Sequence, residues 1–137
     1  MGTFEWTPEM SVGVKEIDEQ HAELTGIINS LYYAYMDGKD HEILADLINK
    51  VNDYAQKHFA TERRYMAPYV DDMPNYDEHM QQHREFFTTG VNFLLEYLDK
   101  GTGITPELLD YLTDWWFRHI NGTDKIMGAL LKSKGVV

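Results

Sequence analysis

Apolar residues recur at steps of three and four along four stretches of the chain, which is the spacing of one face of an α-helix. Segments that contain glycine or proline and lack this period separate the four stretches. No stretch shows the apolar–polar alternation of a strand. The pattern therefore predicts an all-α fold with helices over about residues 14–37, 40–66, 75–99 and 105–132.

Two of the predicted helices begin with capping residues. Asp40 is suited to be the N-cap of the second helix, and Thr105 followed by Pro106 combines an N-cap with proline at the first helical position. Four helices joined by short connections favour an antiparallel, up-down-up-down four-helix bundle. The 137 residues are enough for one such domain covering residues 1–137.

The first 13 residues differ from the rest of the chain. Residues 1–13 have no helical period and contain Pro8 and Gly13. We expect an irregular N-terminal arm there, with the aromatic side chains of Phe4 and Trp6 packed on the bundle.

Charge and composition exclude several classes of protein. Twelve Lys and Arg against 23 Asp and Glu give a net charge of −11, which disfavours nucleic acid and anionic membrane surfaces as partners. No apolar run approaches the roughly 18 residues of a membrane span, and no secretory signal is visible. We therefore expect a cytoplasmic protein. Because the sequence contains no cysteine, disulfides, thiolate metal sites and cysteine nucleophiles are excluded.

Five of the six histidines lie on the predicted inward stripes, whereas His41 lies in a turn where we expect it to be exposed. The inward face takes two to three of every seven positions, so this placement has a chance of roughly a few per cent or less. One buried histidine bonded to a neighbour would be ordinary. Histidines on all four helices instead indicate a metal site; they are His21, His58, His79, His83 and His119.

The number and type of donors point to more than one metal ion. Imidazole suits Fe, Zn, Cu and Ni, and five nitrogens exceed what one tetrahedral zinc takes. Two adjacent cations need bridging carboxylates to offset their repulsion. Glu62 lies one helical turn after His58 and is one candidate. Asp124 is the other, although five residues of regular helix turn it about 140° away from His119.

A local distortion would bring Asp124 inward, and Asn121-Gly122 is where we predict it. The competing architecture, the ferritin-like di-iron bundle, requires Glu-x-x-His on two helices. No glutamate stands three residues before any histidine; those positions hold Asp18, Gly38, Ala55, Tyr76, Met80 and Trp116. The ferritin-like alternative therefore fails on its own motif.

Three motifs in this order resemble those of the hemerythrins, most of all the single-domain bacterial members. They are His58-Phe-Ala-Thr-Glu62, His79-Met-Gln-Gln-His83 and His119-Ile-Asn-Gly-Thr-Asp124, preceded by Ile17-Asp18-Glu19-Gln20-His21. The resemblance covers nearly the whole chain, and all seven expected ligand positions are filled.

The resemblance implies a non-heme di-iron centre. His79, His83 and His119 would hold one iron, and His21 and His58 the other. Glu62, Asp124 and a bridging oxide or hydroxide would join the two irons. Counted this way, the iron held by two histidines keeps one open position, where the resemblance places O2.

The spacing also suggests a pocket for O2. Its candidate residues follow or flank the ligands on the same stripes: Leu24, Phe59, Trp115, Trp116 and Ile120. Each of them is equally suited to plain core packing. Trp116 is a departure, because the family often has leucine three residues before the last histidine. We hypothesise that this indole narrows the O2 channel, slows O2 exchange or protects the centre against autoxidation.

The function implied is reversible O2 binding for transport, storage or local supply to an oxygen-consuming enzyme. Because no signalling or membrane segment accompanies the bundle in this sequence, we expect carriage in preference to an oxygen- or redox-sensing module. A di-iron enzyme acting on peroxide or nitric oxide ranks last, since no acid–base pair is visible beyond the ligands. The sequence does not predict an oligomeric state.

Overall fold

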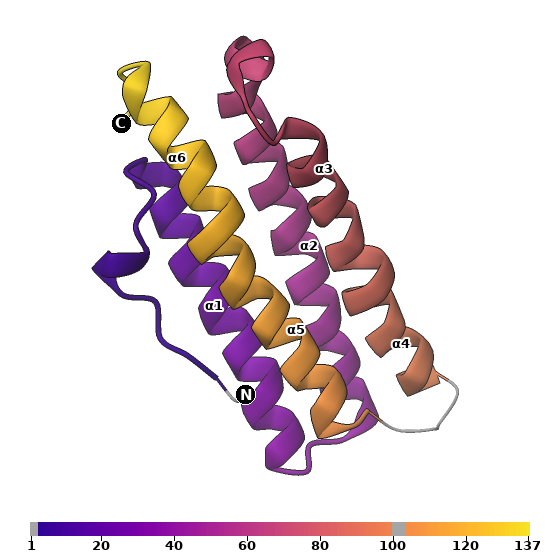
Figure 1. Cartoon of the computed structure of the whole chain (residues 1–137). Helices are drawn as coiled ribbons and strands as arrows, with labels where there is room; N and C mark the ends of the chain where they lie inside the picture. Colours follow the sequence, from indigo (N-terminus) through magenta and orange to yellow (C-terminus); the bar gives the residue numbers. More distant parts are fainter. Residues whose placement is uncertain (1–2, 100–103) are drawn as a thin grey trace.

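The computed structural model describes residues 3–99 and 104–137. Within these ranges the chain is helical, with no strand. The described elements form four helical segments along the chain. Figure 1 shows these segments side by side, each running opposite to the one before it. The predicted all-α, antiparallel four-helix bundle is therefore confirmed. No helix among these residues is long and apolar enough to cross a membrane.

The first two segments are unbroken helices, whereas the last two each contain a π-helix. The first two are α1 (Lys15–Met36) and α2 (His41–Met66). The third segment consists of α3 (Tyr76–Glu85), the π-helix η3 (Phe86–Val91) and α4 (Asn92–Asp99). The fourth consists of α5 (Pro106–Arg118), the π-helix η4 (His119–Thr123) and α6 (Asp124–Ser133).

Short 3-10 helices and side-chain caps shape the ends of these segments. The 3-10 helices are η1 (Pro8–Met10) in the arm and η2 (Ala67–Asp72) after α2. Both predicted N-caps are confirmed: Asp40 accepts a hydrogen bond from the backbone N–H of Ile43, and Thr105 accepts one from Leu108. These bonds satisfy amides that the first turn of a helix leaves free.

Each π-helix advances the inward face by one residue, which the steps of three and four did not predict. Counted onward from His79 and His119 in steps of three and four, the predicted inward stripes include Phe93 and Ile126. Their side chains are instead 40% and 44% exposed. Leu94 and Met127, one residue later in each case, are buried instead. A π-helix accommodates one extra residue in its turn, so every later side chain takes the orientation of its predecessor in a regular helix.

The core has two apolar clusters with a polar layer between them. The larger cluster fills the end of the bundle near the turn between α1 and α2, and the smaller one lies at the other end, around Met66 and Met127. Along α1, Ile17 belongs to the smaller cluster and Leu24 to the larger one, with His21 between them. The histidines are therefore enclosed by apolar packing on both sides.

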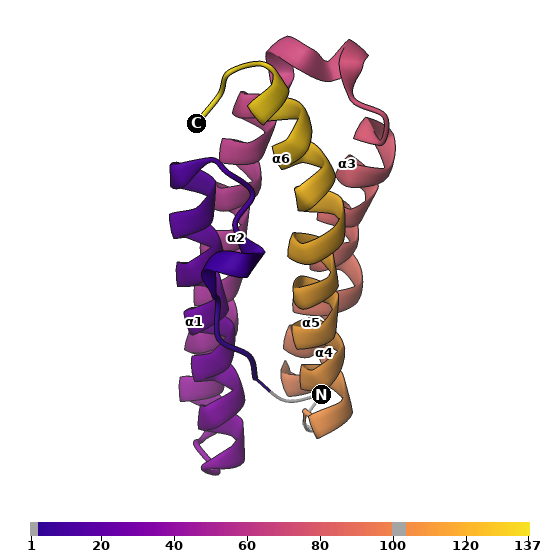
Figure 2. The ribbon, with the colours of Figure 1, turned by 60° about the vertical axis from the view of Figure 1, so that its left-hand side comes forward.

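The N-terminal arm is fastened to α1 and to the fourth segment (Figure 2). Phe4 and Trp6 pack against the larger apolar cluster, as predicted. The ammonium of Lys125 donates to the backbone oxygens of Glu9 and Ser11. At Gly128 a Cβ atom would lie 2.3 Å from the backbone oxygen of Val12, so only glycine lets the arm approach α6 this closely.

Candidate metal centre

Seven side chains with metal-binding groups lie buried at the middle of the bundle. All seven are at most 4% exposed, and they are the ones predicted from sequence: His21, His58, Glu62, His79, His83, His119 and Asp124. They come from α1, α2, α3 and the junction of η4 with α6. His41, the remaining histidine, is exposed at the start of α2.

Regular helix geometry aligns four of these residues in pairs. His58 and Glu62 are four residues apart in α2, and His79 and His83 are four apart in α3. Residues at this spacing lie on the same face, one turn apart. The side chains of each pair therefore point into the same space between the helices.

The five-residue spacing of His119 and Asp124 is accommodated by η4. The π-helix covers His119–Thr123, which contains the Asn121-Gly122 step where a distortion was predicted. Bonds in a π-helix join residues five apart, so they bring Asp124 back under His119. The Nε2 atom of His119 lies 3.2 Å from the Oδ1 atom of Asp124. The predicted distortion is therefore confirmed.

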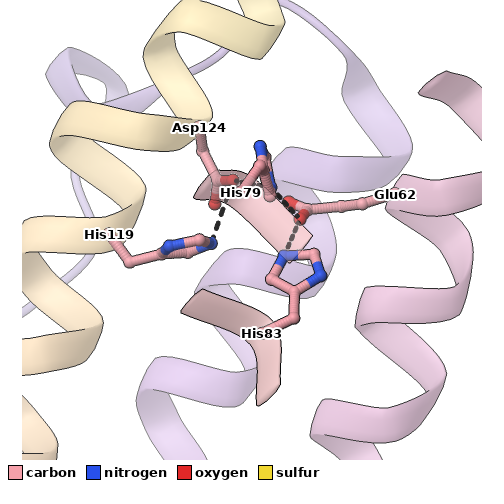
Figure 3. Close-up of side chains that lie close together, drawn as sticks. All are labelled: Glu62, His79, His83, His119 and Asp124. Atoms are coloured by element: carbon pink, nitrogen blue, oxygen red, sulfur yellow. Dashed lines mark hydrogen bonds and ion pairs between the residues drawn. The ribbon is translucent and has the colours of Figure 1, made fainter. Parts of the chain in front are cut away.

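The donor atoms form two groups that share both carboxylates. In each group one ligand atom per residue lies within 4.8 Å of all the others. The larger group, shown in Figure 3, contains three histidines and is called the three-histidine group: His79, His83, His119, Glu62 and Asp124. The smaller one is called the two-histidine group: His21, His58, Glu62 and Asp124.

Each shared carboxylate turns one oxygen toward each group. The Oε1 atom of Glu62 lies 3.0 Å from Nε2 of His83, and its Oε2 atom lies 3.1 Å from Nε2 of His58. Asp124 places Oδ1 3.1 Å from Nε2 of His79 and Oδ2 3.0 Å from Nε2 of His21. This is the orientation that two carboxylates need in order to bridge a pair of cations.

Several of these atoms are close together without being hydrogen bonded. The Nε2 atoms of His58, His83 and His119 and both oxygens of Asp124 are buried, and they have no hydrogen-bond partner among the described residues. Buried polar atoms are normally paired, because an unpaired one costs on the order of 1–3 kcal/mol. Here the atoms converge without hydrogen-bond geometry, which fits a metal site.

The buried histidines and carboxylates of the site shift one another's pKa values. Burial lowers the pKa of His21 and His79, but the adjacent carboxylates of Asp124 and Glu62 outweigh it and raise each to about 9. Burial prevails at His83 and lowers its pKa to about 4. Burial alone would raise the pKa of both carboxyl groups, yet the surrounding histidines hold both well below their ordinary values. The carboxylates of Glu62 and Asp124 thus favour the protonated forms of His21 and His79, and a bound cation would take the place of those protons.

The aromatic side chains predicted as a pocket surround the two groups differently. Trp116 is fully buried, and its ring meets the rings of His21 and His58 edge-on, at centroid distances of 5.4 and 5.7 Å. Phe59 stacks on His83 at 3.9 Å and also touches His58.

Trp115 contacts the three-histidine group instead. It stacks on His119 at 4.8 Å and lines a surface pocket beside that residue. The other two predicted pocket residues, Leu24 and Ile120, are buried in the larger apolar cluster. Trp116 is therefore the aromatic residue that covers the two-histidine group most directly.

Two further contacts were not predicted from sequence. The amide oxygens of Gln20 and Gln82 lie against the Nδ1 atoms of His58 and His119. A signal was nevertheless present, because each glutamine directly precedes another histidine of the site. Helix periodicity alone does not show that such a side chain reaches a neighbouring helix.

Known proteins provide an independent comparison. Bacteriohemerythrin of Stenotrophomonas maltophilia is 28% identical over 135 residues, which are 97% of this chain and 84% of that protein. Bacteriohemerythrin of Clostridium acetobutylicum is 27% identical over 128 residues, 89% of this chain and 96% of that one. A solved structure of a hemerythrin with a leucine-to-tyrosine substitution superimposes with a TM-score of 0.81. It is 21% identical and covers 96% of this chain and 98% of its own.

The family comparison agrees with the site and with the fold. The family model of the hemerythrin HHE cation binding domain matches residues 12–131, a range that contains all seven donor residues. The bundle has the fold of the solved hemerythrin, and the family model matches most of the chain, including the donors that converge in its core. The chain therefore belongs to the hemerythrin family.

Proposed function

We propose that this protein binds O2 reversibly at a centre of two iron ions, for transport, storage or local supply to an oxygen-consuming enzyme. The observation that carries the proposal is the arrangement of five buried imidazoles and two shared carboxylates in two groups of unequal size. Imidazole and carboxylate donors without thiolate suit iron. Membership of a family named for cation binding supports the same choice.

In this proposal the two groups hold one iron each. The three-histidine group provides five protein donor atoms and the two-histidine group four, because Glu62 and Asp124 contribute one oxygen to each. A bridging oxide or hydroxide would add one donor to both. With six donors per iron, the three-histidine group would then be complete, and the two-histidine group would leave room for one exogenous ligand. Iron held there in the ferrous state would supply the electrons that reversible O2 binding requires.

The residues around the two-histidine group provide an apolar enclosure. Trp116 covers His21 and His58 edge-on, and its indole N–H donates to the hydroxyl of Thr25 at 2.9 Å. Thr25 in turn donates to the backbone oxygen of His21. These bonds fix the indole over the group, where it excludes water and limits the side reactions that water permits.

The decisive experiment begins with the protein loaded with ferrous iron in the absence of air. Its optical spectrum is recorded while O2 is admitted and then removed. Ligand-to-iron charge-transfer bands that appear with O2 and vanish on its removal are expected. Conversion to a stable diferric spectrum would contradict reversible binding and favour a redox sensor or an enzyme.

One observation favours a second candidate, an oxygen- or redox-sensing module. Lys125 adjoins Asp124 in sequence and holds the backbone oxygens of Glu9 and Ser11 in the arm. A change at the metal centre would therefore reach the arm through α6. Limited proteolysis of the arm in the diferrous and diferric protein tests this candidate. Identical cleavage rates in the two states would eliminate it.

A further inference from the structure

Two glutamines lie directly behind imidazoles of the centre, one in each group. Gln20 in α1 places its amide oxygen 2.8 Å from Nδ1 of His58 in α2. Gln82 in α3 places its amide oxygen 2.7 Å from Nδ1 of His119. The two contacts repeat one design, in which the residue before a histidine on one helix supports a histidine on another helix.

The other three imidazoles have no such support. The Nδ1 atoms of His21, His79 and His83 are buried and have no hydrogen-bond partner among the described residues. His58 in the two-histidine group and His119 in the three-histidine group thus differ from the other three in having a glutamine oxygen at Nδ1. The distinction lies in the contacts and not in burial, since all five rings are enclosed.

The orientation of the Gln20 amide is determined by its own partners. The hydroxyl of Thr61 donates to the backbone oxygen of Lys57, so it accepts from the amide nitrogen of Gln20 at 3.1 Å. The amide oxygen must then face His58. An oxygen of this kind only accepts, so Nδ1 of His58 carries the proton. The lone pair of Nε2 is left facing the carboxylates, where a cation would bind.

Gln82 has the same effect on His119 and an additional one. Its amide nitrogen donates to Glu78 at 3.3 Å, and its oxygen also accepts from the hydroxyl of Thr123 at 2.7 Å. His119 and Thr123 are the first and last residues of η4. A single oxygen therefore holds both ends of the π-helix that brings Asp124 inward.

We propose that Gln20 and Gln82 are positioning residues for the metal centre, one for each group of donors. Each fixes the tautomer and ring orientation of one ligand imidazole and strengthens its Nε2 as a donor. Gln82 also sets the register of η4. This inference rests on the metal centre of the proposed function, but not on the binding of O2.

Substitution by methionine, which is close to glutamine in size, removes the acceptor. We expect Gln20→Met and Gln82→Met to release bound metal to a chelator about 10–100-fold faster, the range usual for such supporting residues. The effect of Gln82→Met should be the larger, because Thr123 also loses its partner. Gln81→Met is the matched control, since Gln81 is an exposed neighbour on the same helix, and its release rate should stay at that of the unmodified protein.

Substitution by glutamate separates positioning from packing. The variants Gln20→Glu and Gln82→Glu keep an acceptor at the same place and make it stronger. They should release metal no faster than the unmodified protein and should lower the reduction potential of the iron centre, whereas the methionine variants should raise it. A residue that only fills space gives the opposite order, because methionine packs better than a buried carboxylate.

The first measurement uses the full chain loaded with Zn²⁺, so that its outcome is independent of O2. In ¹⁵N–¹H spectra we expect slowly exchanging Nδ1–H signals for His58 and His119, each lost in the corresponding methionine variant. Unchanged signals together with unchanged release rates would overturn the inference even if O2 binds reversibly. Failure of O2 binding alone would overturn the proposed function and leave these signals as expected. Should Gln82→Met not fold, Thr123→Val and Gln82→Glu provide the same test for η4.

Discussion

The first two helical segments and the last two build the metal centre in different ways. The helices α1 and α2 are uninterrupted and contribute His21, His58 and Glu62. The third and fourth segments contain one π-helix each and contribute the remaining donors. An unbroken helix offers donors only at steps of three or four, whereas a π-helix also permits a step of five. The π-helix η4 therefore places His119 and Asp124 on one face, a spacing that an unbroken helix does not allow.

The surroundings of the two donor groups differ as well. The two-histidine group is covered edge-on by Trp116. In the three-histidine group, Phe59 and Trp115 lie flat on the rings of His83 and His119. The three-histidine group thus has more donor atoms and stacked aromatic rings, whereas the two-histidine group has fewer donor atoms and lies beneath one indole.

Single-residue deletions in α2 and in η4 should have the largest and most unequal effects. Deleting Ala60 from α2 turns Glu62 by about 100° relative to His58, so metal binding and much of the stability should be lost. Deleting Gly122 should convert η4 to regular helix and leave Asp124 and Met127 facing inward, with metal affinity within about tenfold. Metal content and thermal unfolding measure both effects. An equal loss of metal content in the two deletion variants would contradict this account of η4.

Removing one donor should distinguish shared from unshared ligands. Asp124→Leu takes an oxygen from both groups, so the protein should retain neither metal ion. His58→Leu affects the two-histidine group alone, and one metal ion should remain in the three-histidine group. Metal analysis after loading and gel filtration gives the stoichiometry. Loss of both ions from His58→Leu would show that the groups are not separable.

Glycine substitutions should separate the last segment from the first. A Cβ at Gly128 meets the backbone of Val12, so Gly128→Ala should destabilise the fold by about 1–3 kcal/mol. Gly26 in α1 has nothing within 4 Å of such a Cβ, and Gly26→Ala should stabilise it by up to about 1 kcal/mol. Denaturant unfolding measures both free energies. Two changes of the same sign would refute the assignment of Gly128 to the arm contact.

Exchange of O2 should depend on Trp116 and not on Trp115. Trp116→Leu removes the indole that covers His21 and His58, so O2 association and dissociation should become about tenfold faster, equivalent to about 1.4 kcal/mol in the barrier. Trp115→Leu is the matched control, because Trp115 stacks on His119 of the three-histidine group. Stopped-flow spectroscopy gives both rates. Unchanged rates in Trp116→Leu would eliminate the access role of this residue.

The smallest expected effect concerns the contact between Tyr54 in α2 and Glu23 in α1. Burial and the carboxylate of Glu23, to which its hydroxyl donates, raise the pKa of Tyr54 from 10 to about 12. Because the pKa is raised on folding, the contribution to stability is complete below pH 10 and is lost between pH 10 and about 12. Glu23→Gln should bring the pKa of Tyr54 closer to 10 in ¹³C-tyrosine NMR titrations. No change would mean that Glu23 does not act on this phenol.

Much of the site followed from spacing alone. The pairs His58 with Glu62 and His79 with His83 are visible because a regular helix repeats nearly every four residues. Even the distortion before Asp124 was predictable, since its five-residue spacing conflicts with regular helix geometry. The π-helix η3 gave no such signal, because no ligand pair spans it, and Phe93 was wrongly placed inward as a result.

The helices, the bundle and the seven candidate donors follow from the amino-acid sequence, because they depend on local periodicity and on residue chemistry. Which oxygen of Glu62 and Asp124 faces which group depends instead on how the helices are rotated against one another, and this is defined by packing. Packing also decided that Gln20 and Gln82 reach imidazoles on neighbouring helices. Contacts between segments distant in sequence have no period along the chain, and only packing defines them.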